Sequence, residues 1–498
     1  MTLSIQDAPS PAPGIRRYEN LVLLAVCACT ILVVGFVAAI NLAVPLLTAS
    51  ELHPTSSQLL WIVDVYVIVF ACLVIPGGAI GDRFGRKGAL VSGLLVFAAG
   101  TVAAALSSTV PLMLAGRVVS GAGAALVLPN CVGVLVHATA PPRRRRAVAL
   151  WGGLSGMGGI VGNTAGAALL DAGSWQTLFW SVAPVAVICA VVVTLIVRPS
   201  PHVFRSLDLT GTVLLVATAV ALLGGIIQAP EQGWGSPTVL GTFALALALG
   251  AAWVVVELRV KHPLLDPRLF RSPLLSGAAL GMMVTWFGSF GLFYLNASLL
   301  QYGRGWSVLA AGLATLPLAI PIVALGATVP AIAARIGVPA TLGSAFALIS
   351  AGLVGLSFAT GQPFAVYALW LIVVGAGFAL ALPTLTSELT ASLPAEQAGV
   401  AGGLQSFTRE LGSALGIAVT GTIAVAVFSG HLPAPLQALD PVPRTIVEAG
   451  ARAPGSSQQI IAAFVMGADT ALQVGAAVTL LAGILVVALV ARRTHRGR

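Results

Sequence analysis

The chain has 498 residues, of which 58% are hydrophobic and only 8% are charged. Soluble proteins carry about 25% charged residues, so this composition excludes a soluble domain and indicates an integral membrane protein. The formal net charge of +9 also fits a nucleic-acid-binding protein. The positions of the basic residues along the chain give a different explanation of this charge.

Fourteen stretches are apolar over the roughly 20 residues that a helix needs to cross the hydrocarbon layer. Most connections between them are short, which leaves no room for a soluble domain. The predicted spans are residues 21–45, 58–80, 88–107, 111–137, 146–170, 177–197, 209–228, 238–257, 273–297, 307–330, 338–358, 364–389, 398–428 and 469–491.

The basic residues predict the orientation of these spans. An even number of spans places both termini on one side of the membrane. If that side is the cytoplasm, all but five of the 25 Lys and Arg residues lie in cytoplasmic segments, as the positive-inside rule requires. The positive charge is therefore a topology signal, and we expect no nucleic-acid partner. The five exceptions are Arg304, Arg444 and Arg452 outside and Arg117 and Arg409 within spans.

Short strings recur at a nearly constant distance along the chain. GAGAALVLP (121–129) returns as GAGFALALP (375–383), identical at seven of nine positions with an offset of 254. RFG at 83 returns as RIG at 335, and GGL at 152 returns as GGL at 402, with offsets of 252 and 250. The chain is therefore read as a duplicated helical bundle. Parallel repeats of this kind are a transporter architecture, with the substrate held between the halves near mid-membrane.

The fold class that we predict is an all-α membrane protein with two six-helix bundles and two inserted central helices. The expected parts are a cytoplasmic tail (1–20), the first bundle (21–200), the inserted helices (201–260), the second bundle (261–491) with its external segment (429–468), and a basic cytoplasmic tail (492–498). The external segment is too polar to span the membrane and is either a disordered linker or a lid.

The string GAIGDRFGRK (78–87) joins the second and third spans on the cytoplasmic side. Its glycines permit a tight turn, and Asp82 is placed to cap the next helix or to pair with an arginine. In this form the string resembles the signature loop of the major facilitator superfamily. The resemblance implies a gating role for Gly78, Asp82, Arg83, Gly85, Arg86 and Lys87.

Two later stretches extend this resemblance. LMLAGRVVSGAGAA (112–125) is similar to the superfamily's fourth-helix motif, with Arg117 as its intramembrane arginine. WGGLSGMGGIVGNTAGAALL (151–170) is similar to its fifth-helix antiporter motif, although Asn163 and Ala167 replace the usual Pro and Gly. The glycines in such a run let helices approach closely. The implied packing positions are Gly152, Gly156, Gly158, Gly162 and Gly166.

With fourteen spans and WIVDVY at 61–66, the chain resembles the fourteen-helix drug:proton antiporter family, in particular exporters of quaternary ammonium compounds and related cationic antiseptics and dyes. The first-helix motif of that family is retained at Asn41, but its acidic residue aligns with Phe36. The thirteenth span keeps an acid at Glu410, yet has Gln405 and Ser406 where cation exporters often carry carboxylates. Fewer acids favour neutral or singly charged substrates.

Asp64 lies inside the second span, where an ionised carboxylate costs roughly 2.5–3.5 kcal/mol on insertion scales. It is about six residues, or roughly 9 Å, from the external end of its helix, at a depth similar to that of Arg117. The two residues could form a structural ion pair. Alternatively, Asp64 faces the cavity and exchanges a proton for substrate, which is the default expectation for an intramembrane ionisable residue.

Other candidates lie in the second half. Glu410 and Arg409 are near mid-membrane and, as sequence neighbours, point about 100° apart on a helix, so they need not pair. Glu388 is near a cytoplasmic helix end, where a carboxylate is also compatible with a purely structural role. Asp64, Glu410, Arg117, Glu388 and Asn41 form the candidate set for proton coupling and substrate binding. Aromatic residues that could stack on flat substrates or anchor the helices at the membrane interface are Trp61, Tyr66, Trp286, Phe287, Phe290, Phe293 and Tyr294.

These features predict a secondary active exporter that moves amphipathic drug-like or antibiotic molecules, cationic ones included, out of a bacterial cell in exchange for protons. The alternatives are a dedicated exporter of one self-made metabolite and, in another class, a non-transporting membrane receptor or scaffold. The sequence has no Walker string, no catalytic triad and no metal-ligand spacing among its five cysteines, so we expect no enzyme activity and no cofactor. The expected protein is a monomer in the cell (inner) membrane.

The charge asymmetry gives a topological prediction. In a variant without native cysteines, single cysteines within 143–146 should react with an impermeant maleimide only from the cytoplasmic side. Cysteines within 435–455 should react only from outside, because that segment carries few positive charges and follows an odd number of spans. Right-side-out and inside-out vesicles supply the two orientations, and labelling of both segments from one side would contradict the fourteen-span arrangement.

Overall fold

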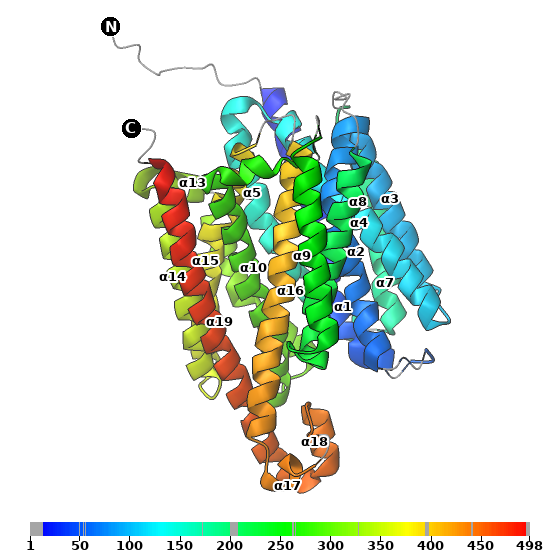
Figure 1. Ribbon diagram of the computed structural model, residues 1–498, viewed down its shortest axis with the longest axis vertical. Coiled ribbons are helices and arrows are strands. Elements are labelled where there is room, and N and C mark those ends of the chain that lie inside the picture. Colours follow the sequence, from blue (N-terminus) through cyan, green and yellow to red (C-terminus); the bar gives the residue numbers. More distant parts are fainter. Residues whose placement is uncertain are drawn as a thin grey trace.

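A computed structural model describes residues 13–494 except 49, 53, 55, 172, 200–207, 261–262, 264, 327, 394–397 and 440–441. Within these residues the regular elements are helices, and they form one bundle (Figure 1). The start of α1 and the end of α19 lie at the upper end of the bundle in Figure 1, which we call the terminal end. The helices α17 and α18 lie at the opposite end.

The first seven helices share one apolar core. At its centre the rings of Phe36, Tyr66, Phe97 and Phe179 meet edge to face. These helices are α1 (Pro13–Thr48), α2 (Ser56–Phe84), α3 (Arg86–Ala105), α4 (Val110–Ala138), α5 (Pro141–Gly156), α6 (Gly158–Asp171) and α7 (Trp175–Ile196).

The second half has a core of its own, built mainly from α10, α12, α14, α15 and α19. Between the halves run the inserted helices α8 (Leu209–Gln232) and α9 (Pro237–Glu257), and α8 packs against both α2 and α16. The remaining helices are α10 (Pro273–Ser298), α11 (Val308–Leu313), α12 (Leu316–Leu325), α13 (Val329–Ile336), α14 (Val338–Ala359), α15 (Phe364–Ala391), α16 (Ala398–Gly430), α17 (Ala434–Gln437), α18 (Ile446–Arg452) and α19 (Ser457–Thr494), with short 3₁₀ turns at Pro267–Arg271 and Pro454–Ser456 and a π turn at Leu299–Gly303.

The number of unbroken spans is smaller than the sequence suggests. Twelve helices of the described chain are long and apolar enough to cross a membrane, or thirteen if the bent pair Leu309–Leu325 and Val329–Ile336 is one span. The expected span 146–170 is divided at Met157, because glycines on both sides weaken the helix there. The expected span 307–330 is divided by prolines and bends by 66°. The all-helical membrane fold is confirmed, whereas the count of fourteen stays a prediction.

The recurring strings occupy equivalent places in the two halves. Gly85 and Gly337 each precede a helix with a positive φ, 101° and 86°, a backbone conformation that glycine adopts readily. A Cβ on Gly121 of α4 would lie 2.7 Å from a carbonyl oxygen of α2, and one on Gly375 of α15 would lie 2.2 Å from a carbonyl oxygen of α12. Thus α4 packs on α2 as α15 packs on α12, although the exact boundaries of the expected parts stay predictions.

The segment at 429–468, predicted to be external, is folded where the structure describes it. An apolar cluster formed by Phe428, Leu432, Leu436, Ala449 and Ile460 joins the end of α16, the short helices α17 and α18, and the start of α19. The segment is therefore a small helical cap rather than an extended linker, and α19 begins about a dozen residues before the predicted span at 469.

The contact between α1 and α6 gives a stability prediction. A Cβ on Gly162 would lie 2.1 Å from the carbonyl oxygen of Gly35, so Gly162→Ala should separate the two helices and destabilise the protein by about 1–3 kcal/mol. Gly88→Ala is the matched control, because no atom lies within 4 Å of its Cβ position and alanine favours the helix by about 0.5–1 kcal/mol. Thermal unfolding in detergent measures both variants, and an unchanged midpoint for Gly162→Ala would contradict the close contact.

Candidate functional site

Arg117 of α4 is fully buried and is held against α2. Its Nε donates to the carbonyl oxygen of Ile62 at 2.8 Å, and its Nη2 donates to that of Val63 at 2.9 Å. Its guanidinium also lies over the rings of Tyr66 and Phe36, with Cζ 4.6 and 5.2 Å from the ring centroids. Arg117 therefore binds the backbone of α2 immediately before position 64. The ring of Phe36 lies where members of the drug:proton antiporter family are expected to carry a carboxylate.

Arg409 and Glu410 of α16 form a buried ion pair. Glu410 Oε1 accepts from Arg409 Nε at 2.8 Å and lies 2.7 Å from Nη2. Sequence neighbours start about 100° apart on a helix, and the long arginine side chain folds back across this angle. The guanidinium Cζ lies 5.3 Å from the ring centroid of Phe70 and 5.9 Å from that of Trp286.

These two sites are connected along one face of α2. Tyr66 and Phe70 are one helical turn apart, and their rings stack at 6.3 Å with an interplanar angle of 16°. A continuous row of contacts therefore runs from Arg117 through Tyr66 and Phe70 to Arg409. Phe70 belongs to the core of the first half and Trp286 to that of the second, so the row ends at the boundary between the halves.

At the terminal end a second set of contacts joins the halves. Arg145 of α5 donates from Nε to Ser387 Oγ at 3.1 Å and forms an ion pair with Glu388 of α15 through Nη2. Nearby, a Cβ on Gly152 would lie 2.6 Å from Thr386 Oγ1, which shows how closely α5 and α15 approach. Glu388 is thus an inter-half contact, which is the structural role left open for it.

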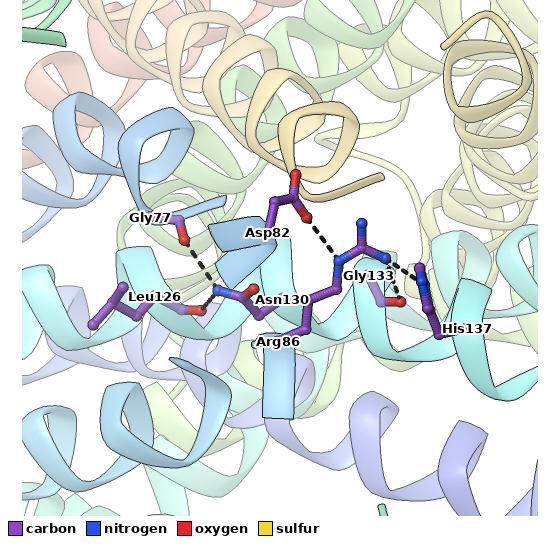
Figure 2. Close-up of polar contacts among 7 residues, drawn as sticks. All are labelled: Gly77, Asp82, Arg86, Leu126, Asn130, Gly133 and His137. Carbon is purple, nitrogen blue, oxygen red and sulfur yellow. Dashed lines mark hydrogen bonds and ion pairs between the residues drawn. The ribbon is translucent and has the colours of Figure 1, made fainter. Parts of the chain in front are cut away.

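The turn between α2 and α3 is bound to α4 (Figure 2). Arg86 donates from Nε to Asp82 Oδ1 at 2.7 Å and from Nη1 to the carbonyl oxygen of Gly133 at 3.0 Å. Its Nη1 also lies 2.5 Å from His137 Nδ1. Because a guanidinium only donates, a hydrogen bond at this contact requires His137 Nδ1 to be the acceptor.

The other residues of this turn also act within the first half. Lys87 donates to the carbonyl oxygen of Thr194 at 2.8 Å, close to the end of α7, where a positive charge complements the helix dipole. Arg83 lies 5.1 Å from the ring centroid of Phe84, and Gly85 supplies the positive φ that starts α3. Gly78 is buried in the last turns of α2.

The glycines of α6 line its contact with α1. Cβ atoms on Gly158 and Gly166 would lie 2.8 Å from Val34 Cβ and 2.6 Å from Ala39 Cβ, and Gly162 lies between them against Gly35. Three successive turns of α6 thus need the absence of a side chain. Residue 64 lies in α2, residue 41 in α1 and residue 156 in α5, but the side chains of Asp64 and Asn41 and the surroundings of Gly156 lie outside the described residues.

Some residues of the site were not predicted from the sequence. Phe70 carries a signal, because it follows Tyr66 by one helical turn. From the sequence, Arg145 is only one of four consecutive arginines that set the orientation, and its individual partner has no sequence signature. Asn130 is a polar residue in an apolar helix; its Nδ2 donates to the carbonyl oxygens of Gly77 at 3.1 Å and Leu126 at 2.7 Å and ties α4 to α2 (Figure 2).

Comparisons with known proteins show which chains this one is similar to. The chain is 30% identical to the "Tetracenomycin C resistance and export protein" of Streptomyces glaucescens, over 87% of this chain and 82% of that protein. It is 31% identical to the "Methylenomycin A resistance protein" of Streptomyces coelicolor, over 84% and 88% of the two chains. The crystal structure of the human organic anion transporter MFSD10 superimposes with a TM-score of 0.63 at 17% identity, covering 95% of this chain and all of that one, which shows the shared fold.

The sequence profile of the Major Facilitator Superfamily matches residues 26–417, which is most of the chain. The chain therefore belongs to the major facilitator superfamily.

Proposed function

We propose that this chain is a secondary active exporter that carries amphipathic drug-like or antibiotic molecules out of the cell in exchange for protons. The observation that carries the proposal is the row of buried cations, rings and carboxylate that crosses from the first half to the second. Ionisable side chains at such depth in a membrane bundle mark a functional pathway. In transporters built from repeats, the substrate binds at the boundary between them.

The names of the relatives support export and leave open how many different substrates are exported. Both relatives confer resistance to a single named antibiotic, and one of them is also described as an export protein. This supports the narrower alternative, a dedicated exporter of one metabolite, as well as a broad drug exporter. A receptor or scaffold has no need for buried charges between its halves, so we place it last. The family and fold are those of a transporter rather than of an enzyme.

Alternating access requires that contacts between the halves break at one end while others form. The Arg145–Glu388 pair and the close approach of α5 to α15 hold the terminal end together. When a buried carboxylate such as Glu410 gains a proton, it loses its negative charge and its attraction for the neighbouring arginine. The contacts between the halves can then change, and with them the end of the bundle that is open. We propose that the terminal end faces the cytoplasm of a bacterial cell, in agreement with the positive-inside rule.

The inter-half ion pair gives a prediction by charge reversal. Arg145→Glu places two carboxylates in contact and should favour opening of the terminal end. The pair is partly exposed and contributes about 0.5–1 kcal/mol, so efflux should fall about two- to fivefold. The double variant Arg145→Glu/Glu388→Arg restores opposite charges and should recover most of the rate. Equal losses in the single and double variants would mean that the pair does not control the opening.

Asp64 provides the test of proton coupling. Asp64→Asn is nearly the same size and removes a costly intramembrane charge, so the variant should reach the membrane in normal amount. It should nevertheless fail to drive uphill efflux of a fluorescent substrate from proteoliposomes with an imposed pH gradient. Asp64→Glu should keep part of the activity with a shifted pH optimum, and Glu410→Gln should do less damage if Asp64 is the main site.

Asp171→Asn is the matched control, because this residue is exposed at the end of α6 and should be neutral for efflux. Full uphill efflux by Asp64→Asn would leave Asp64 with only a structural role next to Arg117, and the proton would have to be carried elsewhere.

A further inference from the structure

The guanidinium of Arg409 occupies a small box between the two halves. Its walls are the ring of Phe70 from α2 and the ring of Trp286 from α10, and its floor is the carboxylate of Glu410. All four side chains are at least nine-tenths buried. Phe70 and Trp286 each lie at the middle of their helices, so the box is at mid-depth of the bundle.

The occupant of this box has a defined chemistry. A guanidinium is a flat ion whose single positive charge is delocalised, and it is paired here with one carboxylate and lies within reach of two ring faces. These are also the groups that would recognise a planar organic monocation. The guanidinium of Arg409 is joined to the backbone by three methylene groups, so rotation of these bonds offers a route out of the box.

We propose that the box of Phe70, Trp286 and Glu410 is a binding subsite for planar, delocalised monocations, and that Arg409 is a tethered occupant that the substrate displaces. This inference rests on the proposed export function and names a substrate class for it. Displacement keeps Glu410 paired with one positive charge throughout, so the carboxylate is never left alone in an apolar region, which would cost several kcal/mol.

The same arrangement sets a charge limit. Glu410 balances one positive charge, and a second charge on the ligand would meet the displaced but still nearby guanidinium of Arg409. A neutral flat molecule has the opposite disadvantage, since it would leave Glu410 without a counter-charge when Arg409 moves away. The subsite therefore selects monocations over both dications and neutral analogues of the same shape.

Equilibrium binding to the purified full-length protein in nanodiscs tests this selection. The probe is proflavine, a flat fluorescent monocation, and the comparison ligands are acridine, its neutral parent ring at pH 7.5, and the dication methyl viologen. Of the three ligands, proflavine should bind most tightly to the wild-type protein. Glu410→Gln should weaken proflavine binding about tenfold and change acridine binding less than twofold, and Trp286→Leu should weaken proflavine binding about threefold, in the range of one cation–π contact.

The decisive variant is Arg409→Ala. Removing a tethered competitor should tighten proflavine binding about tenfold, whereas removing an ordinary binding or packing residue would weaken it. Millimolar guanidinium chloride should then displace proflavine from Arg409→Ala, and the same concentration of sodium chloride should not. Arg304→Ala is the matched control, because Arg304 also lies over two rings, those of Trp306 and Tyr367, and should give no guanidinium effect.

Weaker proflavine binding by folded Arg409→Ala, or no guanidinium effect on it, would overturn the proposal. If Arg409→Ala aggregates, Arg409→Lys keeps the charge but replaces the flat group with a compact ammonium, and proflavine binding should still tighten; unchanged or weaker binding overturns the proposal. The assay uses no gradient. If guanidinium competes with proflavine but no proton-driven efflux is found, the subsite is supported and proton coupling is rejected. If proton-driven efflux is found but guanidinium does not compete, only the subsite is rejected.

Discussion

A charge inside an apolar helical bundle needs a partner within reach, because an unpaired ion taken out of water costs several kcal/mol. The described charges in the middle of this protein meet that requirement in two ways. Arg117 uses backbone carbonyl oxygens and ring faces, and Arg409 uses the adjacent carboxylate of Glu410. Both solutions place an arginine against α2, and this makes one helix face the meeting point of the charged groups.

Glycines make many of the close contacts between helices. Within the first half, glycines bring α1 to within backbone contact of α6, and α2 to within backbone contact of α4. Such close packing resists deformation, because backbone atoms cannot move aside as side chains can. Between the halves there are contacts of both kinds. Cβ atoms on Gly402 and Gly403 of α16 would lie 2.8 Å from backbone atoms of α4 and α2, and the side chains of Arg145 and Phe70 also meet the second half. Relative movement of the halves therefore has to break backbone contacts of α16 as well as side-chain contacts.

Much of this organisation could be predicted from the sequence, and the reasons are physical. Apolar length predicts spans, and the offset near 252 predicts the duplication that the turns at Gly85 and Gly337 display in their backbones. Broken helices were missed, because hydropathy averages over the glycines near Met157 and the prolines near α12. Specific partners were missed for another reason. The pairing of Arg145 with Glu388 joins residues 243 positions apart, and only the packing of the two halves brings them together.

The two copies of the turn, at RFG and RIG, share a backbone conformation but not the charged side chains around it. Both retain a glycine with positive φ, yet the positions equivalent to Asp82 and Arg86 are Ala334 and Val338. In the first copy, α2 extends without a break to Phe84, next to the turn, and Arg86 binds the turn to α4. In the second copy the preceding segment is the separate helix α13, bent by 66° from its neighbour. Ala334 and Val338 cannot form the bonds that Asp82 and Arg86 form, so in the described part of the chain only the first of these turns is fixed by a guanidinium. We therefore expect the two halves of a duplicated structure to differ in stiffness at this turn, with the second copy the softer one.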